Sequence, residues 1–398
     1  MDLKSGFPYS LIKNGLPYVY PALESDLKTS VIIVGAGISG ALTAYALVQA
    51  GIPCVVLDGR TVGLGSTCAS TSLLQYEIDV PLHKLIEKIG EKNAQQAYQQ
   101  CKASIDQLEK ICKTVHCAQF DRKESVYVAS YKKDVGMLEK EFAARKAAGL
   151  KVEWWEEAQL QLHLQTDAPA AICSTDAAQT DAYMFTHALH QYNCKHGAQV
   201  YDRTKAEKIH TSRKGVEILT NKGYKVKAQY LVMATGYESV NYIREHIVQL
   251  LSTYAVISES NSHASVFDHY VVWETKEPYH YIRSAANNRI LIGGRDEEFY
   301  NPTRRDRLIA QKSKQLVQDF QRKFPGETFI PEFSWTGTFG MTTDGLPYIG
   351  EYPRMARTFF ALGFGGNGIT FSQIAANIIA GTLSGKPLKN TEMYSFGR

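Results

Sequence analysis

Uninterrupted apolar runs and helical periods alternate near the start of the chain. Residues 31–34 are four branched apolar residues followed at once by a helical pattern, and residues 53–57 form a second apolar run. Runs without polar interruption are typical of strands that are buried on both faces of a parallel sheet. The pattern therefore predicts an α/β fold that begins with a strand, a helix and a second strand.

Further along, helical spacing of apolar residues predicts amphipathic helices, and alternating or branched patterns predict strands. Segments 216–220 and 225–233 are expected to pair as a hairpin, and residues 1–29 to form an irregular arm on the folded body. The expected helices are 81–118, 135–148, 182–195, 304–324 and one that ends near 384; the expected strands are 124–130, 198–201, 216–220, 225–233, 253–258, 270–273, 280–284, 289–292 and 358–362.

Three glycines follow the first strand at the spacing of a phosphate-binding turn. Gly35 suits the tight turn, Gly37 lets the backbone approach a pyrophosphate, and Gly40 lets the helix pack on the strand. The N-terminus of that helix carries free N–H groups that favour a phosphate. The second strand ends in Asp58, an acid about 20 residues on that can hold a ribose. This order of features indicates a dinucleotide-binding fold.

Three later segments also place bare backbone beside the expected dinucleotide site. Residues 63–74 are small and rich in hydroxyls, which suits close passage beside a flat cofactor or, alternatively, a serine-rich loop that caps a helix. Residues 234–236, Ala-Thr-Gly, end a buried strand. Residues 363–370 form a glycine turn between a strand and a helix, where free N–H groups and the helix dipole stabilise negative charge.

Composition and charge argue against several other classes of protein. The 398 residues favour two domains, and 44% hydrophobic with 21% charged content is that of a globular protein. A net charge of +4 does not indicate a nucleic-acid partner. No signal peptide or membrane span is expected. Seven cysteines without a Cys-x-x-Cys pair indicate reduced thiols, no metal site and a cytoplasmic protein.

Taken together, these segments resemble the FAD-dependent oxidoreductases of the D-amino acid oxidase superfamily, which include sarcosine, glycine and γ-glutamylputrescine oxidases. Five signatures occur in the family's order: 35–40 with Asp58, 65–71, 234–236, 281–283 followed by 292–294, and 363–368. The resemblance implies an α/β fold in which residues 1–80, 168–240 and 334–398 form a Rossmann-like FAD-binding domain. Residues 81–167 and 241–333 would form a substrate domain with a large mixed β-sheet.

The resemblance also implies which residues hold FAD. Residues 337–341 lack the cysteine to which sarcosine oxidases attach their flavin, so FAD is expected to bind non-covalently. The two glycine turns are expected to lie at the pyrophosphate and at the flavin ring. The expected cofactor-binding residues are Gly35, Ala36, Gly37, Ile38, Ser39, Gly40, Asp58, Gly59, Arg60, Ser66, Thr67, Thr71, Leu73, Ala206, Ala234, Thr235, Gly236, Gly337, Gly366, Asn367, Gly368, Ile369 and Thr370.

The chemistry implied by the resemblance is oxidation of a C–N bond. An amine or amino acid gives hydride to FAD N5, the imine is hydrolysed, and oxygen or another acceptor reoxidises the flavin. The expected catalytic residues are Arg283, Tyr281 and Tyr254. Period-two alternation puts Arg283 on the same face of the strand as Tyr281 and puts His280 on the opposite face. The Arg283 guanidinium can then bind a substrate carboxylate or form a structural salt bridge. Leu291 occupies the place of an oxygen-activating lysine, which leaves the acceptor open.

Two other functions fit parts of the pattern. An FAD- and nicotinamide-dependent monooxygenase shares the first glycine turn, and a non-catalytic subunit needs only the dinucleotide site. The Gly-Gly-Asn-Gly segment at 365–368 and the Tyr-x-Arg strand favour an amine oxidase. Within that class, a carboxylate-bearing substrate competes with a polyamine-like amine, and Arg283 favours the former. The sequence does not name the substrate or the oligomeric state.

Overall fold

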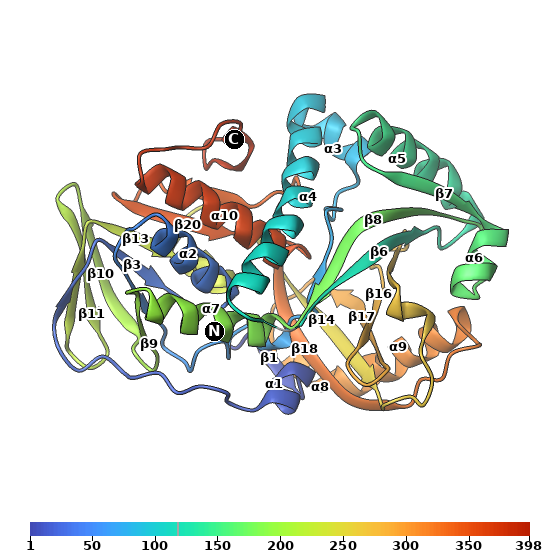
Figure 1. The fold of residues 1–398 in the computed structure, drawn as a ribbon, viewed down its shortest axis with the longest axis horizontal. Coiled ribbons are helices and arrows are strands. Elements are labelled where there is room, and N and C mark those ends of the chain that lie inside the picture. Colours follow the sequence, from blue (N-terminus) through green and yellow to red (C-terminus); the bar gives the residue numbers. More distant parts are fainter. Residues whose placement is uncertain (118) are drawn as a thin grey trace.

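The computed structural model describes residues 1–117 and 119–398 and shows two bodies side by side (Figure 1). One body is built on a mainly parallel sheet between helices and a small sheet, and the other on a large mixed sheet. Helix α4 (Glu91–Thr114) lies between them. The described residues form three sheets, of six, four and ten strands. The expected α/β architecture with a large mixed sheet is thereby confirmed.

The apolar runs of the N-terminal pattern form central strands of the six-stranded sheet. Val31 and Ile33 pack under the helices, whereas Ile32 and Val34 pack on the four-stranded sheet. Both faces are covered, which explains why these strands contain no polar position. The six strands are, in order, β19 (Tyr348–Glu351), β20 (Thr358–Leu362), β13 (Tyr230–Met233), β3 (Val31–Val34), β4 (Cys54–Leu57) and β9 (Gln199–Tyr201); the helices are α2 (Ile38–Gln49), α7 (Ala182–Lys195) and α10 (Gly368–Leu383).

The four-stranded sheet covers the other face of the parallel sheet. Its order is β10 (Ala206–Ser212), β11 (Gly215–Thr220), β12 (Lys225–Ala228) and β2 (Leu27–Lys28). Its apolar side chains belong to the same buried cluster as Ile32 and Val34. Strands β4, β3, β13 and β20 of the six-stranded sheet run parallel to one another. Their carboxyl ends point toward the second body.

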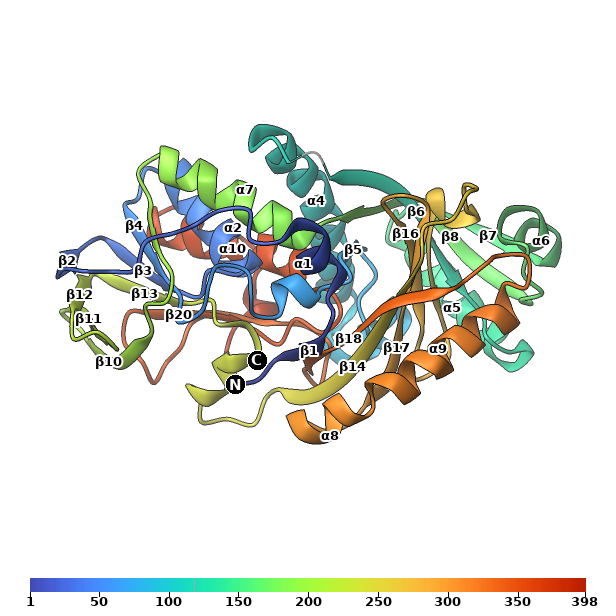
Figure 2. The same cartoon turned by 90° about the horizontal axis from the view of Figure 1, so that it is seen from below.

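The ten-stranded sheet carries helix α9 (Ile309–Lys323) on one face, as Figure 2 shows. Its other face is partly turned toward the first body. The strand order is β1 (Lys4–Gly6), β18 (Pro331–Met341), β14 (Gln249–Ser258), β17 (Arg289–Glu297), β16 (Tyr281–Ala285), β15 (Tyr270–Glu274), β6 (Phe120–Val128), β8 (Ala170–Thr180) and β5 (Leu73–Leu74), with β7 (Val152–Glu156) paired to β8. The remaining helices are α1 (Tyr9–Asn14), α3 (Leu82–Ile89), α5 (Val135–Ala147), α6 (Glu157–Leu164) and α8 (Pro302–Arg307). Within the described part of the chain, no helix has both the length and the apolar character needed to span a membrane.

Three expected elements are each divided in two. The expected helix 81–118 breaks at Gly90, whose φ of +82° ends a helix, and α4 then stops at Thr114; position 118 lies outside the described residues. The expected helix 304–324 is divided at Leu308. The expected strand 225–233 is divided at Gln229, because β12 stays in its hairpin with β11 while β13 joins the six-stranded sheet.

Strands from the expected FAD-binding segments also contribute to the ten-stranded sheet. The arm at 1–29 is partly regular, since β1 pairs with β18 and α1 follows it. Strands β8 and β18 fall within or across the ranges 168–240 and 334–398, yet both pair with strands of the second body. The two bodies are therefore joined by shared segments, and the domain boundaries by residue number stay a prediction.

Candidate functional site

A cavity of about 680 Å³ lies between the carboxyl edge of the six-stranded sheet and the ten-stranded sheet. This is the edge at which open parallel sheets bind ligands, and the volume is in the range of small-molecule sites. We call the part lined by Gly35, Gly37, Asp58 and Ala206 the glycine end. The sheet end is the part lined by Asp79, Tyr237, Thr253, Trp273, Tyr279, Tyr281 and Asp296.

The first glycine turn is locked by close backbone approaches. Gly35 has a φ of +110°, and a Cβ there would lie 2.3 Å from the carbonyl oxygen of Ala234. A Cβ on Gly40 would lie 1.8 Å from the Gly35 carbonyl oxygen. These contacts explain why glycine occupies both positions. They also hold the N-terminus of α2 at the cavity.

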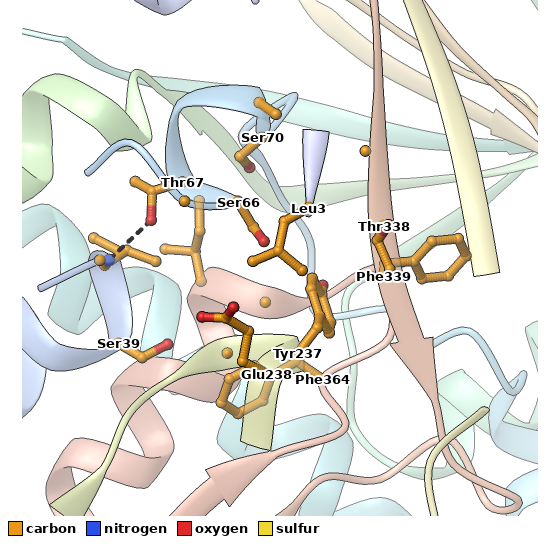
Figure 3. Close-up of a pocket in the computed structure, with 18 of the residues that line it drawn as sticks. Leu3, Ser39, Ser66, Thr67, Ser70, Tyr237, Glu238, Thr338, Phe339 and Phe364 are labelled. Atoms are coloured by element: carbon orange, nitrogen blue, oxygen red, sulfur yellow. Dashed lines mark hydrogen bonds between the residues drawn. The ribbon is translucent and has the colours of Figure 1, made fainter. Parts of the chain in front are cut away.

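The N-cap residue of α2 is Gly37, which has no side chain to cap the helix. The Ile38 N–H donates to Thr67 Oγ1 at 3.1 Å, and Figure 3 shows this hydroxyl pointing at the first turn of α2. The neighbouring Ser66 Oγ is buried and has no hydrogen-bond partner among the described residues. The other N–H groups of this first turn, beside the unsatisfied Ser66 hydroxyl, are suited to bind an anion.

Asp58 follows β4 and is fixed by main-chain donors. Its carboxylate accepts the N–H groups of Ala36 at 2.7 Å and Arg60 at 2.8 Å. Burial raises the pKa of Asp58, and the two N–H groups oppose that rise. The Arg60 guanidinium forms two 2.9 Å bonds to Glu238 and so does not point freely into the cavity.

The second glycine turn leads into α10, which also lacks a side-chain cap within the described chain. The Asn367 amide donates to the carbonyls of Gln75 at 3.1 Å and Glu77 at 2.8 Å. The Gly366 N–H donates to Asp79 Oδ2 at 2.8 Å, and the Tyr279 hydroxyl donates to Asp79 Oδ1 at 3.0 Å. Segment 75–79 is therefore tied to the α10 turn on one side and to the ten-stranded sheet on the other.

An aromatic row crosses the ten-stranded sheet at the sheet end. Residues directly opposite one another on neighbouring strands are Tyr127, Trp273, Tyr281 and Gly293. Tyr127 and Trp273 stack with ring centroids 3.7 Å apart, and the Tyr281 ring lies over Gly293, where a Cβ would be 2.3 Å from it. Tyr279 lies 6.1 Å from both Trp273 and Tyr281. Packed rings of this kind form a rigid apolar wall.

A β-bulge turns Asp296 toward this wall. Strand β14 pairs Tyr254 with Gly294 but Ser252 with Glu297, so two residues of β17 oppose Thr253 alone. Arg295 sits in the bulge with a φ of +58° and pairs with Asp319 of α9. Asp296 lines the cavity instead, and its buried Oδ1 has no partner in the described structure. Burial raises the pKa of Asp296 to about 7.

The cavity brings together most of the residues that the sequence indicated. The expected residues that line it are Gly35, Gly37, Ile38, Ser39, Asp58, Gly59, Arg60, Ser66, Thr67, Thr71, Leu73, Ala206, Ala234, Thr235, Gly236, Tyr254, Tyr281, Gly337, Gly366, Asn367, Gly368 and Ile369. Ala36, Gly40 and Thr370 are not in the lining. Ala36 and Gly40 support the turn, and the Thr370 hydroxyl bonds to its own helix at Asn367 O.

Arg283 does not line the cavity, so the expected grip on a substrate carboxylate does not fit the geometry. Its side chain is buried, with Nε bonded to the Thr71 carbonyl and Nη1 donating to the Ser284 carbonyl at 2.7 Å. The expected salt bridge is not formed within the described residues either. Tyr254 borders the cavity, but its ring packs in the cluster under α9, 5.5 Å from the Lys312 ammonium. We therefore retain only Tyr281 of the three as a residue facing the reaction space.

His280 lies on the opposite face, as alternation predicts. Its ring contacts Glu274 at 2.6 Å and Asp319 at 3.2 Å. The sequence interpretation passed over Asp79, Tyr237, Trp273, Tyr279 and Asp296 as site residues. Tyr279 could have been found from its period-two spacing with Tyr281. Trp273 depends on the register between β15 and β16, and Asp296 depends on a bulge that no local pattern indicates. No cluster of three or more metal-ligating side chains occurs among the residues described.

Comparisons with known proteins identify the family of the chain. A family described as FAD dependent oxidoreductase matches residues 30–382. The chain is 20% identical to the probable oxidoreductase OrdL of Haemophilus influenzae, which covers 92% of this chain and 86% of that protein. It is 22% identical to γ-glutamylputrescine oxidoreductase of Escherichia coli, with the same two coverages. It is 23% identical to glycine oxidase of Geobacillus kaustophilus, over 89% of this chain and 92% of that protein.

Solved structures show the same fold. The glycine oxidase structure from Geobacillus kaustophilus has a TM-score of 0.78 at 21% identity and covers 94% of this chain and 99% of its own. The L-proline dehydrogenase structure from P. horikoshii has a TM-score of 0.79 at 18% identity and covers 93% and 97%.

The cavity fits an extended dinucleotide. Two uncapped helix N-termini face it, the Ser66 hydroxyl is buried and unsatisfied by any described residue, and side chains on Gly37 or Gly366 would enter occupied space. Free N–H groups at the two turns suit the negative charge of a pyrophosphate and of a reduced flavin. The chain belongs to the family of FAD-dependent oxidoreductases, and its cofactor is FAD.

Proposed function

We infer that this protein oxidises the C–N bond of an amine or amino acid and releases an imine that water hydrolyses. One observation carries the inference: a single cavity joins the glycine end to the aromatic sheet end. The relatives named as glycine oxidase, γ-glutamylputrescine oxidoreductase and L-proline dehydrogenase support the same reaction class. A protein that only bound a dinucleotide would not need the aromatic wall at the sheet end.

The chain offers holding groups for each part of FAD. The N-terminus of α2 with Gly35 and Gly37 would hold the pyrophosphate, and Asp58 the adenosine ribose. The turn at Gly366–Gly368 would hold the flavin ring. Once bound, FAD would supply a two-electron acceptor that takes hydride from the carbon beside the nitrogen.

The sheet end would position the substrate. Trp273, Tyr279 and Tyr281 give it packed rings that exclude water and fix the orientation of the reacting carbon. The hydrogen bond between Tyr279 and Asp79 keeps one ring from rotating. A strong base is not required, because the amine needs only to be held in its neutral form when the hydride leaves.

Anaerobic reduction of the purified, FAD-bound protein tests this function. We expect the visible flavin absorption to bleach with at least one member of a panel of primary amines, N-methyl amines, glycine, sarcosine and D- and L-amino acids. NADPH should leave the flavin oxidised. Bleaching by NADPH and by no amine would instead identify a monooxygenase, and no bleaching by either would favour a non-catalytic subunit.

A further inference from the structure

We propose that the sheet end selects a positively charged amine without a neighbouring carboxylate, with Asp296 as the carboxylate that meets the ammonium and accepts its proton before the hydride leaves. This inference rests on the proposed function and names the substrate class of the same site. It reverses the preference for a carboxylate-bearing substrate that Arg283 suggested. Its basis is the charge at the sheet end, the aromatic rings that line it and the Asp296 carboxylate oxygen, which has no hydrogen-bond partner among the described residues.

The residues that define the sheet end include two carboxylates, Asp79 and Asp296, and no basic side chain. Glu77 also lines the cavity, but it pairs with the buried Arg145. Arg60 and Lys205 are the basic side chains in the lining, and both lie at the glycine end beside Asp58 and Gly59. Lys312 approaches from α9 but pairs with Glu297 on the other side of the sheet. A substrate carboxylate would therefore enter a buried space that already holds negative charge, which is unfavourable.

Asp296 is the carboxylate that is free to bind. Asp79 already accepts from the Gly366 N–H and the Tyr279 hydroxyl. Asp296 Oδ1, in contrast, is buried and has no hydrogen-bond partner among the described residues. A buried unsatisfied carboxylate oxygen costs free energy, and an ammonium N–H that reaches it recovers a charge-assisted hydrogen bond.

The rings around Asp296 suit the same ligand. The ring centroid of Tyr279, just before β16, lies 6.1 Å from those of Tyr281 and Trp273, and Tyr281 is paired with Gly293. Aromatic faces attract cations, most strongly where water is excluded. Because of the bulge at Arg295, the Asp296 side chain rather than the Arg295 side chain faces the cavity. Bulges beside active sites commonly redirect a side chain in this way.

Binding of two matched probes tests the proposal. n-Butylammonium and butyrate have the same carbon chain and opposite charge, and each is titrated into the FAD-bound protein while flavin absorption and melting temperature are followed. We expect n-butylammonium to bind and butyrate not to bind. Asp296→Asn, which keeps the shape and removes the charge, should weaken n-butylammonium at least about tenfold. Tighter binding of butyrate, or an unchanged affinity in Asp296→Asn, would overturn the proposal.

A control variant separates charge selection from folding. Asp106→Asn removes a carboxylate on α4 whose side chain is 55% exposed, and it should bind both probes as the native protein does. Asp296→Asn should retain its FAD and its cooperative melting. An Asp296→Asn protein that loses FAD would be replaced by Asp296→Glu, which keeps the charge and should keep the preference for n-butylammonium over butyrate.

The pH dependence gives a second readout. Burial and the nearby Asp79 raise the pKa of Asp296, which lies at about 7, while the Thr253 hydroxyl and Lys312 oppose the rise. Tyr279 and Tyr281 face it as neutral hydroxyls, because burial raises the pKa of both. The affinity for n-butylammonium should therefore increase as the pH rises through about 7, and Asp296→Asn should abolish that increase. A pH-independent affinity in the native protein would contradict the role of Asp296.

The two proposals fail in different ways. Flavin reduction only by amino acids, with butyrate bound more tightly than n-butylammonium, would leave C–N oxidation intact and overturn the selection of a charged amine. Binding of n-butylammonium through Asp296 without flavin reduction by any amine would support the selection and overturn C–N oxidation.

Discussion

Replacing Arg145 with methionine is expected to destabilise the protein by about 3–5 kcal/mol, the usual cost of breaking a buried ion pair from one side. The Arg145 side chain has no exposed surface, and it donates to Glu141 at 2.7 Å and to Glu77 at 3.2 Å. Methionine fills a similar space but leaves two buried carboxylates without their cation. Urea unfolding of the native protein and the variant measures the difference.

The loss should shrink in acid. Burial alone would raise the pKa of Glu141, but the Arg145 guanidinium and the bonds from His83 lower it to about 2. The contribution of the Glu141 carboxylate to the free energy of unfolding is therefore complete above the ordinary carboxyl pKa and is lost as the pH falls toward 2. In Arg145→Met, protonation removes the unpaired buried charges of Glu77 and Glu141. The difference in unfolding free energy between the native protein and the variant should therefore decrease as the pH falls. Arg122→Met is the control, since its ion pairs are exposed and should be worth less than about 1 kcal/mol. Equal losses in both variants would contradict the account.

The second large effect is expected from Gly40→Ala, which should cost at least about 1–3 kcal/mol and sharply reduce FAD retention. A Cβ at Gly40 would lie 1.8 Å from the Gly35 carbonyl oxygen. The glycine turn cannot move away from this Cβ, because Gly35 is itself packed against the Ala234 carbonyl. Helix α2 must therefore shift, and its N-terminus moves away from the pyrophosphate site. Urea unfolding and the ratio of flavin to protein absorption measure the two effects.

Gly136→Ala is the matched control for that variant. Gly136 also lies in a helix, α5, and a Cβ there would meet no described atom within 4 Å. Alanine should be neutral or stabilise by up to about 1 kcal/mol, because it restricts the unfolded chain and favours helix. If Gly40→Ala behaved like Gly136→Ala, the first glycine turn would not be a rigid element.

The glycine end could be predicted because each of its parts is encoded by a short, continuous stretch of sequence. A buried strand, Gly35 and Gly40, and the acid at Asp58 follow one another within one β-α-β unit, so local pattern is enough. The α10 turn at Gly366–Gly368 was found for the same reason. The expected helix 81–118 was divided because Gly90 interrupts a longer periodic pattern.

The sheet end could not be predicted, because it is made by pairing between distant strands. Trp273 and Tyr281 become neighbours through the register of β15 and β16, and Asp296 faces them only because β17 is bulged. Simple alternation put Arg283 on the cavity face, but the guanidinium turns to the carbonyls of Thr71 and Ser284. Thr71 lies 212 positions away in the chain, so nothing local to the strand reveals that partner.

The central claim is that one cavity couples the bound flavin to oxidation of a C–N bond, and the stoichiometry of a single anaerobic turnover tests it most directly. The FAD-bound protein is mixed without oxygen with the amine that bleaches it fastest, and reduced flavin and the hydrolysed carbonyl product are counted together. We predict one carbonyl product for each flavin reduced. Bleaching without a carbonyl product, or reduction by NADPH alone, would contradict the account.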